Sequence, residues 1–264
     1  MSSEADVKGK DSESGSLMET LRVIVHALIL ALLVRVFLYQ PFNIPSGSMI
    51  PTLLVGDYLF VSKFSYGYSK YSFPWSPNLF SGRILGSEPK RGDVAVFKLP
   101  SDNSTDYIKR VIGLPGDRIQ MIRGVLHING QAVERRRVED FNGPAATCNV
   151  RRAGDIQVAR YLETLPNGVQ HSTLDCRGGS DGDDTPVFEV PAGHYFMMGD
   201  NRDNSTDSRF GANGGYGGVG FVPRENLIGR ADIIFFSISE TASIFAPWRW
   251  PLEIRWPRFF DLID

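Results

Sequence analysis

The chain has 264 residues, 42% of them hydrophobic and 22% charged, which excludes a wholly disordered chain and allows one large domain or two small ones. Its 28 basic and 30 acidic residues give a net charge of -2, whereas a protein that binds nucleic acid usually carries a basic excess. We therefore expect no nucleic acid among its partners. Two cysteines are too few for a small domain built on disulfides.

The mean hydropathy of -0.14 averages over a very uneven N-terminal region. Residues 1–17 are mostly polar, and such a stretch buries too little apolar surface to offset the loss of chain entropy, so we expect a disordered cytoplasmic tail. A long apolar run without Gly or Pro follows and ends before Pro41, which predicts a helix. We interpret residues 18–39 as a transmembrane anchor; a buried core helix and a cleaved signal peptide are the alternatives.

Basic residues predict the orientation of this anchor. Lys8, Lys10 and Arg22 lie at its N-terminal side, whereas the next basic residue beyond the apolar run is Lys63. Because basic residues near a span stay on the cytoplasmic side, the N-terminus is expected in the cytoplasm and residues 40–264 on the outer face. The sequence contains no second apolar run of comparable length, which predicts a single-pass protein.

The outer part predicts a mainly β domain, because short segments rich in β-branched and aromatic residues alternate with turn signals such as Asn129-Gly130. Hairpins are expected between residues 120 and 131. Polar, Arg- and Asp-rich residues at about 135–185 predict a looser, smaller inserted β subdomain. The expected strands are residues 58–61, 93–97, 125–128, 187–190 and 233–236.

A short loop just beyond the anchor carries two serines that could act as nucleophiles. Pro45, Gly47 and Pro51 make a helix unlikely around Ser46 and Ser48 and predict a rigid, kinked loop. A serine nucleophile needs a nearby base and donors for a developing oxyanion. Without a base, both serines are ordinary turn residues.

Lys109 is a candidate for that base. Strand alternation places it on the same face as Tyr107 and Val111, and such apolar neighbours suit a lysine whose pKa is lowered by burial. A lysine on a strand is otherwise a solvated surface residue. The sequence also has four histidines, so a Ser-His-Asp triad remains an alternative, although the G-x-S-x-G motif is absent.

The segment from Asp200 onward is dense in Asp and Asn, which raises the question of a calcium loop. The EF-hand pattern fails, because Ser205 stands where Gly is needed and Gly211 where the bidentate Glu belongs. We therefore predict no metal site here. The alternative is a polar network that orients an active-site group.

Four segments in order behind the anchor resemble the type I signal peptidases (leader peptidases), bacterial membrane-anchored serine proteases with a Ser-Lys dyad. The resemblance implies an endopeptidase that removes N-terminal signal peptides from secreted preproteins after a small-x-small (Ala-x-Ala-like) site. It implies no cofactor, a monomer, and partners that are signal peptides and the lipid bilayer. It also implies a catalytic domain on the outer (periplasmic) face of the plasma (inner) membrane. The segments are residues 46–53, 91–94, 107–117 and 199–209.

The same resemblance assigns roles to polar residues. Ser48 matches the nucleophile and Lys109 the general base. Ser46 matches the residue whose hydroxyl joins the Ser48 backbone N–H in the oxyanion hole. Ser205 matches the serine that orients the lysine amine, beside an ion pair formed by Asp207 with Arg209.

Further expectations concern substrate contacts and the inserted subdomain. Cys148 and Cys176 lie in the insert, where an oxidising outer compartment would permit a disulfide. An aromatic and basic C-terminal part is expected either to rest on the bilayer or to pack against the core. It contains Phe235, Phe236, Trp248, Trp250, Trp256, Phe259 and Phe260, interleaved with Arg249, Arg255 and Arg258. By resemblance, the residues that line shallow apolar substrate pockets are Phe42, Ile44, Pro45, Leu53, Tyr107, Ile108 and Met197.

Two other functions compete with this interpretation. A self-cleaving Ser-Lys regulator of the repressor type would need an N-terminal DNA-binding motif and an Ala-Gly cleavage site upstream of the serine. Here Ala153-Gly154 and Ala192-Gly193 lie downstream. The other competitor is an anchored β-rich binding protein in which Ser48 and Lys109 are incidental; a long distance between their side chains would favour it.

Overall fold

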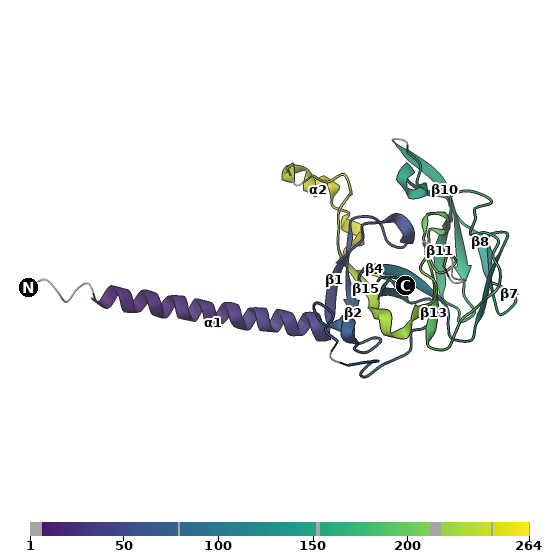
Figure 1. Cartoon of the computed structure of the whole chain (residues 1–264). Coiled ribbons are helices and arrows are strands. Elements are labelled where there is room, and N and C mark those ends of the chain that lie inside the picture. Colours follow the sequence, from purple (N-terminus) through teal and green to yellow (C-terminus); the bar gives the residue numbers. More distant parts are fainter. Residues whose placement is uncertain (1–6, 79, 152–153, 212–217, 244, 264) are drawn as a thin grey trace, which may run out of the picture.

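The computed structural model describes residues 7–78, 80–151, 154–211, 218–243 and 245–263, with side chains from residue 17 onward. One long helix, α1, projects from a β-rich body (Figure 1). The predicted fold class, mainly β behind a single N-terminal apolar helix, is confirmed.

Helix α1 spans Val7–Phe37, and its segment Leu17–Phe37 is long and apolar enough to cross a membrane. It is the only such helix in the part of the chain that the structure describes. Residues 7–17, expected in a disordered tail, are helical, which corrects that expectation. Once an apolar segment has formed a helix, each added residue gains one hydrogen bond without a new nucleation step, so the helix extends into polar sequence. Residues 1–6 lie outside the described residues.

The largest sheet forms the frame of the body. Its strands follow the order β1-β2-β15-β3-β4-β13-β14, and β16 pairs with β15. Neighbouring strands pair antiparallel. The strands are β1 (Tyr39–Asn43), β2 (Asp57–Ser62), β3 (Val94–Lys98), β4 (Asp106–Gly113), β13 (His194–Met198), β14 (Val222–Pro223), β15 (Leu227–Ser237) and β16 (Asp261–Leu262).

Two four-stranded sheets complete the body. The first contains the expected hairpins: β5 (Arg118–Ile122), β6 (Val125–Ile128) and β7 (Gln131–Ala132), with β12 (Phe188–Glu189). The second forms the insert: β8 (Glu134–Arg137), β9 (Phe141–Pro144), β10 (Asp155–Thr164) and β11 (Gln170–Asp175).

The insert is therefore a regular sheet and not the looser unit that its polar sequence predicts. Arg135 explains the difference, because it pairs with Asp175 at 3.1 Å and approaches Glu163 at 3.9 Å across the strands. Its guanidinium also lies 3.6 Å from the ring centroid of Tyr161. Charged residues that predict a loop when taken singly thus stabilise cross-strand contacts.

Short helical turns connect the strands. One of them is the short α-helix α2, which spans Trp250–Glu253 and lies on the α1 side of the body in Figure 1. The 3-10 turns are η1 (Gly47–Met49), η2 (Lys70–Ser72), η3 (Ala145–Cys148), η4 (Arg202–Asn204), η5 (Arg224–Asn226), η6 (Pro247–Arg249) and η7 (Trp256–Arg258).

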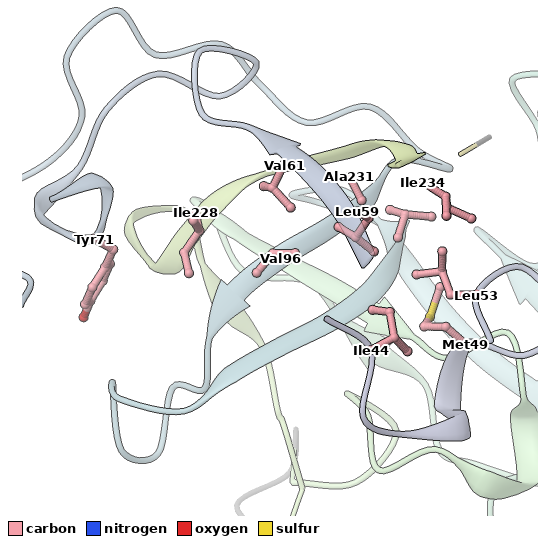
Figure 2. Packing of buried hydrophobic residues seen from close by; sticks show 11 residues of the cluster. Ile44, Met49, Leu53, Leu59, Val61, Tyr71, Val96, Ile228, Ala231 and Ile234 are labelled. Atoms are coloured by element: carbon pink, nitrogen blue, oxygen red, sulfur yellow. The ribbon is translucent and has the colours of Figure 1, made fainter. Parts of the chain in front are cut away.

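A hydrophobic cluster lies beneath the loop that carries the serines. Ile44, Met49 and Leu53 come from this loop and meet Leu59 and Ile234 of the large sheet (Figure 2). Burial of a side chain of this size contributes about 1.5–3 kcal/mol. The cluster therefore fixes the loop to the sheet and restricts the movement of Ser48.

The C-terminal part packs partly against the sheet, which is one of the two arrangements that the sequence allows, and its contact with a bilayer stays a prediction. Phe236, Trp256 and Phe259 pack on one another, with ring centroids 5.4 and 5.6 Å apart for the two contacts of Phe259. Trp248 and Phe260, by contrast, remain 74% and 73% exposed. The packed rings hold the segment to the sheet, and the exposed ones remain available to an apolar partner.

Candidate active site

The serine loop turns at η1, which presents Ser48. Ile50 N–H donates to Gly47 O at 3.3 Å, so residues 47–49 form one 3-10 turn. This corrects the expectation of a loop without helical structure: a single turn needs only one such bond, and Pro45 and Pro51 stand outside it. Asn201 N–H donates to Ser48 O at 3.1 Å and ties the turn to the segment after β13.

Lys109 reaches Ser48 from strand β4. Its Nζ lies 2.7 Å from Ser48 Oγ and donates to Ile108 O at 2.9 Å. The ring of Tyr107 covers the amine from one side, with its centroid 5.4 Å from Nζ. Both partners are buried: Lys109 is 3% exposed and Ser48 is 7% exposed. Lys109 is thus no solvated strand lysine.

Burial changes the acidity of this amine. Desolvation lowers the pKa of Lys109 from 10.5 to about 8, although the negative charges of Asp207 and Asp200 act in the opposite direction. A substantial fraction of the amine is therefore neutral near pH 8. A neutral amine can accept a proton from the adjacent hydroxyl, so the pair has the chemistry of a base and a nucleophile.

Asp207 and Arg209 form a buried bidentate ion pair next to this site. Arg209 Nε donates to Asp207 Oδ1 and Nη2 to Oδ2, both at 2.9 Å. Asp207 Oδ2 also accepts from Gly199 N–H at 3.0 Å. Burial alone would raise the pKa of Asp207, but the guanidinium of Arg209 outweighs it and holds that pKa below its usual value. The pair therefore stays ionised.

Ser205 precedes this ion pair and is also buried. Among the described residues, its Oγ meets no partner with regular hydrogen-bond geometry, although an interaction with it contributes to the lowered pKa of Asp207. The contact with the Lys109 amine that the family resemblance implies is thus absent from the structure. What the structure does provide is a buried hydroxyl beside Asp207 with capacity for a further hydrogen bond.

A cavity of about 480 Å³ opens beside the Ser48–Lys109 pair. Five of the seven expected substrate-contacting residues line it: Phe42, Ile44, Pro45, Tyr107 and Ile108. Ser46 lines it as well and is exposed. The cavity is a cleft between the loop after β1 and the start of β4.

Leu53 and Met197 differ from the expectation. Both are fully buried in hydrophobic clusters, and neither lines the cavity. Leu53 packs under the serine loop and Met197 in the cluster behind β4 and β13. They support the cavity wall from behind and make no surface for a ligand.

Other residues of the cavity were not found from the sequence. Asn204 and Thr206 flank Ser205 in the Asp- and Asn-rich segment, so their position next to a predicted site residue could have identified them. Asp106 immediately precedes Tyr107 and could have been found in the same way. Asn43 and Val96 carry no sequence signal that distinguishes them from other strand residues.

A second buried network lies on the other face of β4. Arg110 donates to both carboxylate oxygens of Asp200, at 2.9 and 2.8 Å, and so joins β4 to the segment after β13. Glu163 of the insert accepts from Arg202 Nη1 at 2.9 Å. These pairs connect the insert and the large sheet around Lys109.

His171 belongs to this network and not to a Ser-His-Asp triad. Its Nε2 lies 3.6 Å from Glu163 and 3.9 Å from Asp200. Burial lowers the pKa of His171 to about 4, with a smaller contribution from Arg110, so the ring is neutral at physiological pH. The side-chain partner of Ser48 is Lys109.

The insert is also linked covalently. A disulfide joins Cys148, at the end of η3, to Cys176, just after β11. Cys176 N–H donates to Asp203 at 2.7 Å, which brings this linkage to the turn η4 beside the cavity.

Comparison with known proteins assigns the chain to a family. The sequence pattern of the family described as "Signal peptidase, peptidase S26" matches residues 17–236. The chain belongs to this family. "Signal peptidase I" of Rickettsia typhi is 44% identical over 81% of this chain and 78% of the relative. "Signal peptidase I" of Rickettsia conorii is 44% identical over 81% of this chain and 77% of the relative.

A solved structure of a signal peptidase I from Enterococcus faecalis is 24% identical and covers 55% of this chain and 97% of that chain, with a TM-score of 0.30. Membership of the signal peptidase family makes the protein a peptidase, a hydrolase that processes signal peptides. Its substrates are preproteins that carry such peptides, and the apolar helix α1 agrees with a membrane-anchored enzyme.

Proposed function

We propose that this signal peptidase is a serine endopeptidase in which Ser48 attacks the peptide bond and neutral Lys109 is the general base. The observation that carries the proposal is the 2.7 Å distance between Lys109 Nζ and Ser48 Oγ in a buried site. In a binding protein with an incidental serine and lysine, nothing would favour the placement of a buried amine against that hydroxyl at the wall of a cavity.

The reaction proceeds in two halves. Neutral Lys109 takes the proton of Ser48 Oγ as this oxygen attacks the carbonyl carbon before the scissile bond. The lysine then gives the proton to the departing amine, which leaves an acyl-enzyme. A water molecule, activated by the same lysine, hydrolyses the ester and restores Ser48.

The negative charge that develops on the carbonyl oxygen needs preorganised donors. We assign them to the backbone N–H of Ser48 and the hydroxyl of Ser46. The Ser46 side chain does not cap η1, so its hydroxyl is not consumed by the turn. Its exposure at the cavity wall supports the same role.

The substrate binds as an added strand. In the described part of the chain, β13 pairs with β4 from Arg110 to Gly113, whereas β3 occupies the opposite edge. The backbone of Tyr107 and Ile108 therefore has a free edge at the cavity, where an extended peptide can form hydrogen bonds.

This binding mode supports a preference for a small-x-small (Ala-x-Ala-like) site. Alternate side chains of an extended peptide point the same way, so the first and third residues before the scissile bond face the enzyme. Phe42, Ile44 and Ile108 restrict the cavity with apolar walls. Small apolar side chains fit such walls, and large or charged ones do not.

The membrane arrangement follows from the ends of α1. We propose a cytoplasmic N-terminus, with Lys8, Lys10 and Arg22 on that side, and a catalytic domain on the outer, periplasmic face of the plasma membrane. Ser48 lies soon after the end of α1 at Phe37, so the nucleophile stays near the membrane surface. The enzyme acts as a monomer on signal peptides that reach it through the lipid.

A cleavage assay tests this function. Full-length enzyme in detergent is incubated with a preprotein that carries Ala-x-Ala before the scissile bond, and the products are sequenced from their N-termini. We expect cleavage after the second Ala, and no product with Ser48→Ala enzyme of unchanged circular dichroism. Full activity of the Ser48→Ala enzyme would rule the proposal out, as would equal cleavage of a substrate with Trp in place of that Ala.

A further inference from the structure

A second cavity of about 410 Å³ lies on the opposite side of the serine loop. We call it the η3 groove; Pro45, Gly47, Ile50, Leu54, Phe141 and Ala146 are the residues that define it. The serine loop supplies one wall, and strand β9 with η3 of the insert supplies the other. No step described above uses this groove.

The η3 groove and the active-site cavity share a thin wall. Ser46 and Ser48 line the active-site cavity, Gly47 lines the η3 groove, and Pro45 lines both. Pro45 and Ser46 are exposed, so the top of this wall is open to solvent. A chain that runs through the active-site cavity and passes Ser48 can therefore continue over the wall into the groove.

Hydrogen bonds hold the two cavities in a fixed relation. Asn204 lines the active-site cavity, and its Nδ2 donates at 3.1 Å to the carbonyl of Thr147, which lines the groove. Asn201 Nδ2 donates to the same carbonyl at 2.7 Å and to Gly47 O at 3.1 Å. The far wall of the groove is thus tied to the loop that carries the nucleophile.

The walls of the η3 groove suit an extended peptide. Ile50, Leu54 and Phe141 are buried or half-buried and make an apolar floor, while Glu240 and Arg255 supply one charge of each sign. Strand β9 pairs with β10 on one edge, and its other edge has no strand partner in the described part of the chain. Such an edge can bond the backbone of a peptide whatever its side chains.

We propose that the η3 groove binds the first residues of the mature protein, those that follow the scissile bond, in an extended conformation. This inference rests on the proposed function, in which the residues before the bond occupy the active-site cavity. Backbone bonding at β9 suits a segment that differs among preproteins, because it demands no fixed sequence. The groove would then hold the leaving side of the substrate in line with Ser48 until the peptide bond breaks.

Two substrates and a matched pair of variants test the inference. The short substrate ends one residue after the scissile bond, and the long one continues for six residues of mature sequence. We expect wild-type enzyme to cleave the long substrate with a kcat/KM about tenfold higher, mainly through a lower KM. Ala146→Trp, which fills the groove from its exposed rim, should remove this advantage and leave the short substrate unaffected.

Ala132→Trp is the control, because Ala132 is exposed on β7 and lines neither cavity. It should retain the advantage of the long substrate. Phe141→Ala serves as a second groove variant and should raise KM for the long substrate alone. An unchanged ratio of the two substrates in both Ala146→Trp and Phe141→Ala would overturn the groove proposal. Failure of wild-type enzyme to cleave either substrate would instead overturn the proposed function.

Discussion

Lys109 Nζ and Ser48 Oγ lie 2.7 Å apart although 61 positions separate the two residues in the chain. The turn η1 fixes the serine over one hydrophobic cluster, and strand β4 brings the lysine to the same point. The contact is formed in the free protein. The base therefore needs no rearrangement to reach the nucleophile.

The first prediction concerns pH. Only the neutral Lys109 amine can act as base, and burial lowers its pKa to about 8. We expect kcat/KM for a preprotein to rise about tenfold per pH unit below this value and to level off above it. A pH profile in detergent measures this, and the catalytic account would be contradicted by activity that is flat from pH 6 to pH 9.

The second prediction concerns Ser205. A protonated Lys109 has three N–H donors, and two acceptors are present, Ser48 Oγ and Ile108 O. The buried Ser205 hydroxyl, which makes no hydrogen bond of regular geometry, is suited to be the third acceptor during the reaction. Ser205→Ala should lower kcat by up to about 100-fold and move the midpoint of the pH profile, because the amine is then poorly oriented.

The stability of the Ser205→Ala variant shows whether Ser205 orients the Lys109 amine or only supports the fold. Removal of a hydroxyl that makes no hydrogen bond of regular geometry should change the free energy of unfolding by less than about 1 kcal/mol. Unaltered kcat and pH midpoint in a folded variant would show that Ser205 does not position the lysine.

The third prediction concerns the buried Asp207–Arg209 pair. Arg209→Met leaves the carboxylate buried without its partner, which should lower the free energy of unfolding by about 3–5 kcal/mol. Because Arg209 depresses the pKa of Asp207, the contribution of the pair is present at neutral pH and is lost as pH falls through that lowered pKa. Denaturant titrations at pH 7 and pH 3 should therefore differ less for the variant than for wild type.

Asp207→Asn probes the pair from the other side, because it retains the shape and leaves the guanidinium of Arg209 buried without its counter-charge. It should also lower the free energy of unfolding, by a similar amount. Equal stability of wild type and Arg209→Met would show that the pair does not support the site.

Local patterns in the sequence were sufficient for the apolar helix and for parts of five strands. The apolar run predicted the apolar segment of α1, from about residue 17 to Phe37. Segments rich in β-branched residues predicted parts of β2, β3, β6, β12 and β15. The start of α1 at Val7 was missed because helix propagation depends on the neighbouring segment more than on the composition of residues 7–16. The order of the insert was missed because the partners of Arg135 lie on other strands.

Local sequence patterns likewise predict the active site only in part. Motif spacing could single out Ser48 and Lys109, but the burial that lowers the pKa of Lys109 comes from residues distant in the chain. Leu53 and Met197 were expected at the cavity from the family resemblance, but an apolar residue near a motif serves equally well as wall or as core. Only the packing distinguishes the two, and it places them in the core.

A second buried lysine permits the most direct test of the central claim. Lys63 is 2% exposed, its pKa is lowered to about 8 chiefly by burial, and its Nζ donates to the carbonyl of Ser72. It matches Lys109 in burial and in pKa and does not line the cavity. Methionine replaces either lysine with similar volume and no charge.

The decisive measurement compares the cleavage rates of a preprotein by Lys109→Met and Lys63→Met enzymes. Loss of a general base lowers the rate by roughly 100- to 10,000-fold, and we expect a loss of this size for Lys109→Met. Lys63→Met should retain cleavage within about threefold of wild type, since burial of a lysine alone has no part in the chemistry. Cleavage at wild-type rate by the folded Lys109→Met enzyme would contradict the assignment of Lys109 as the base.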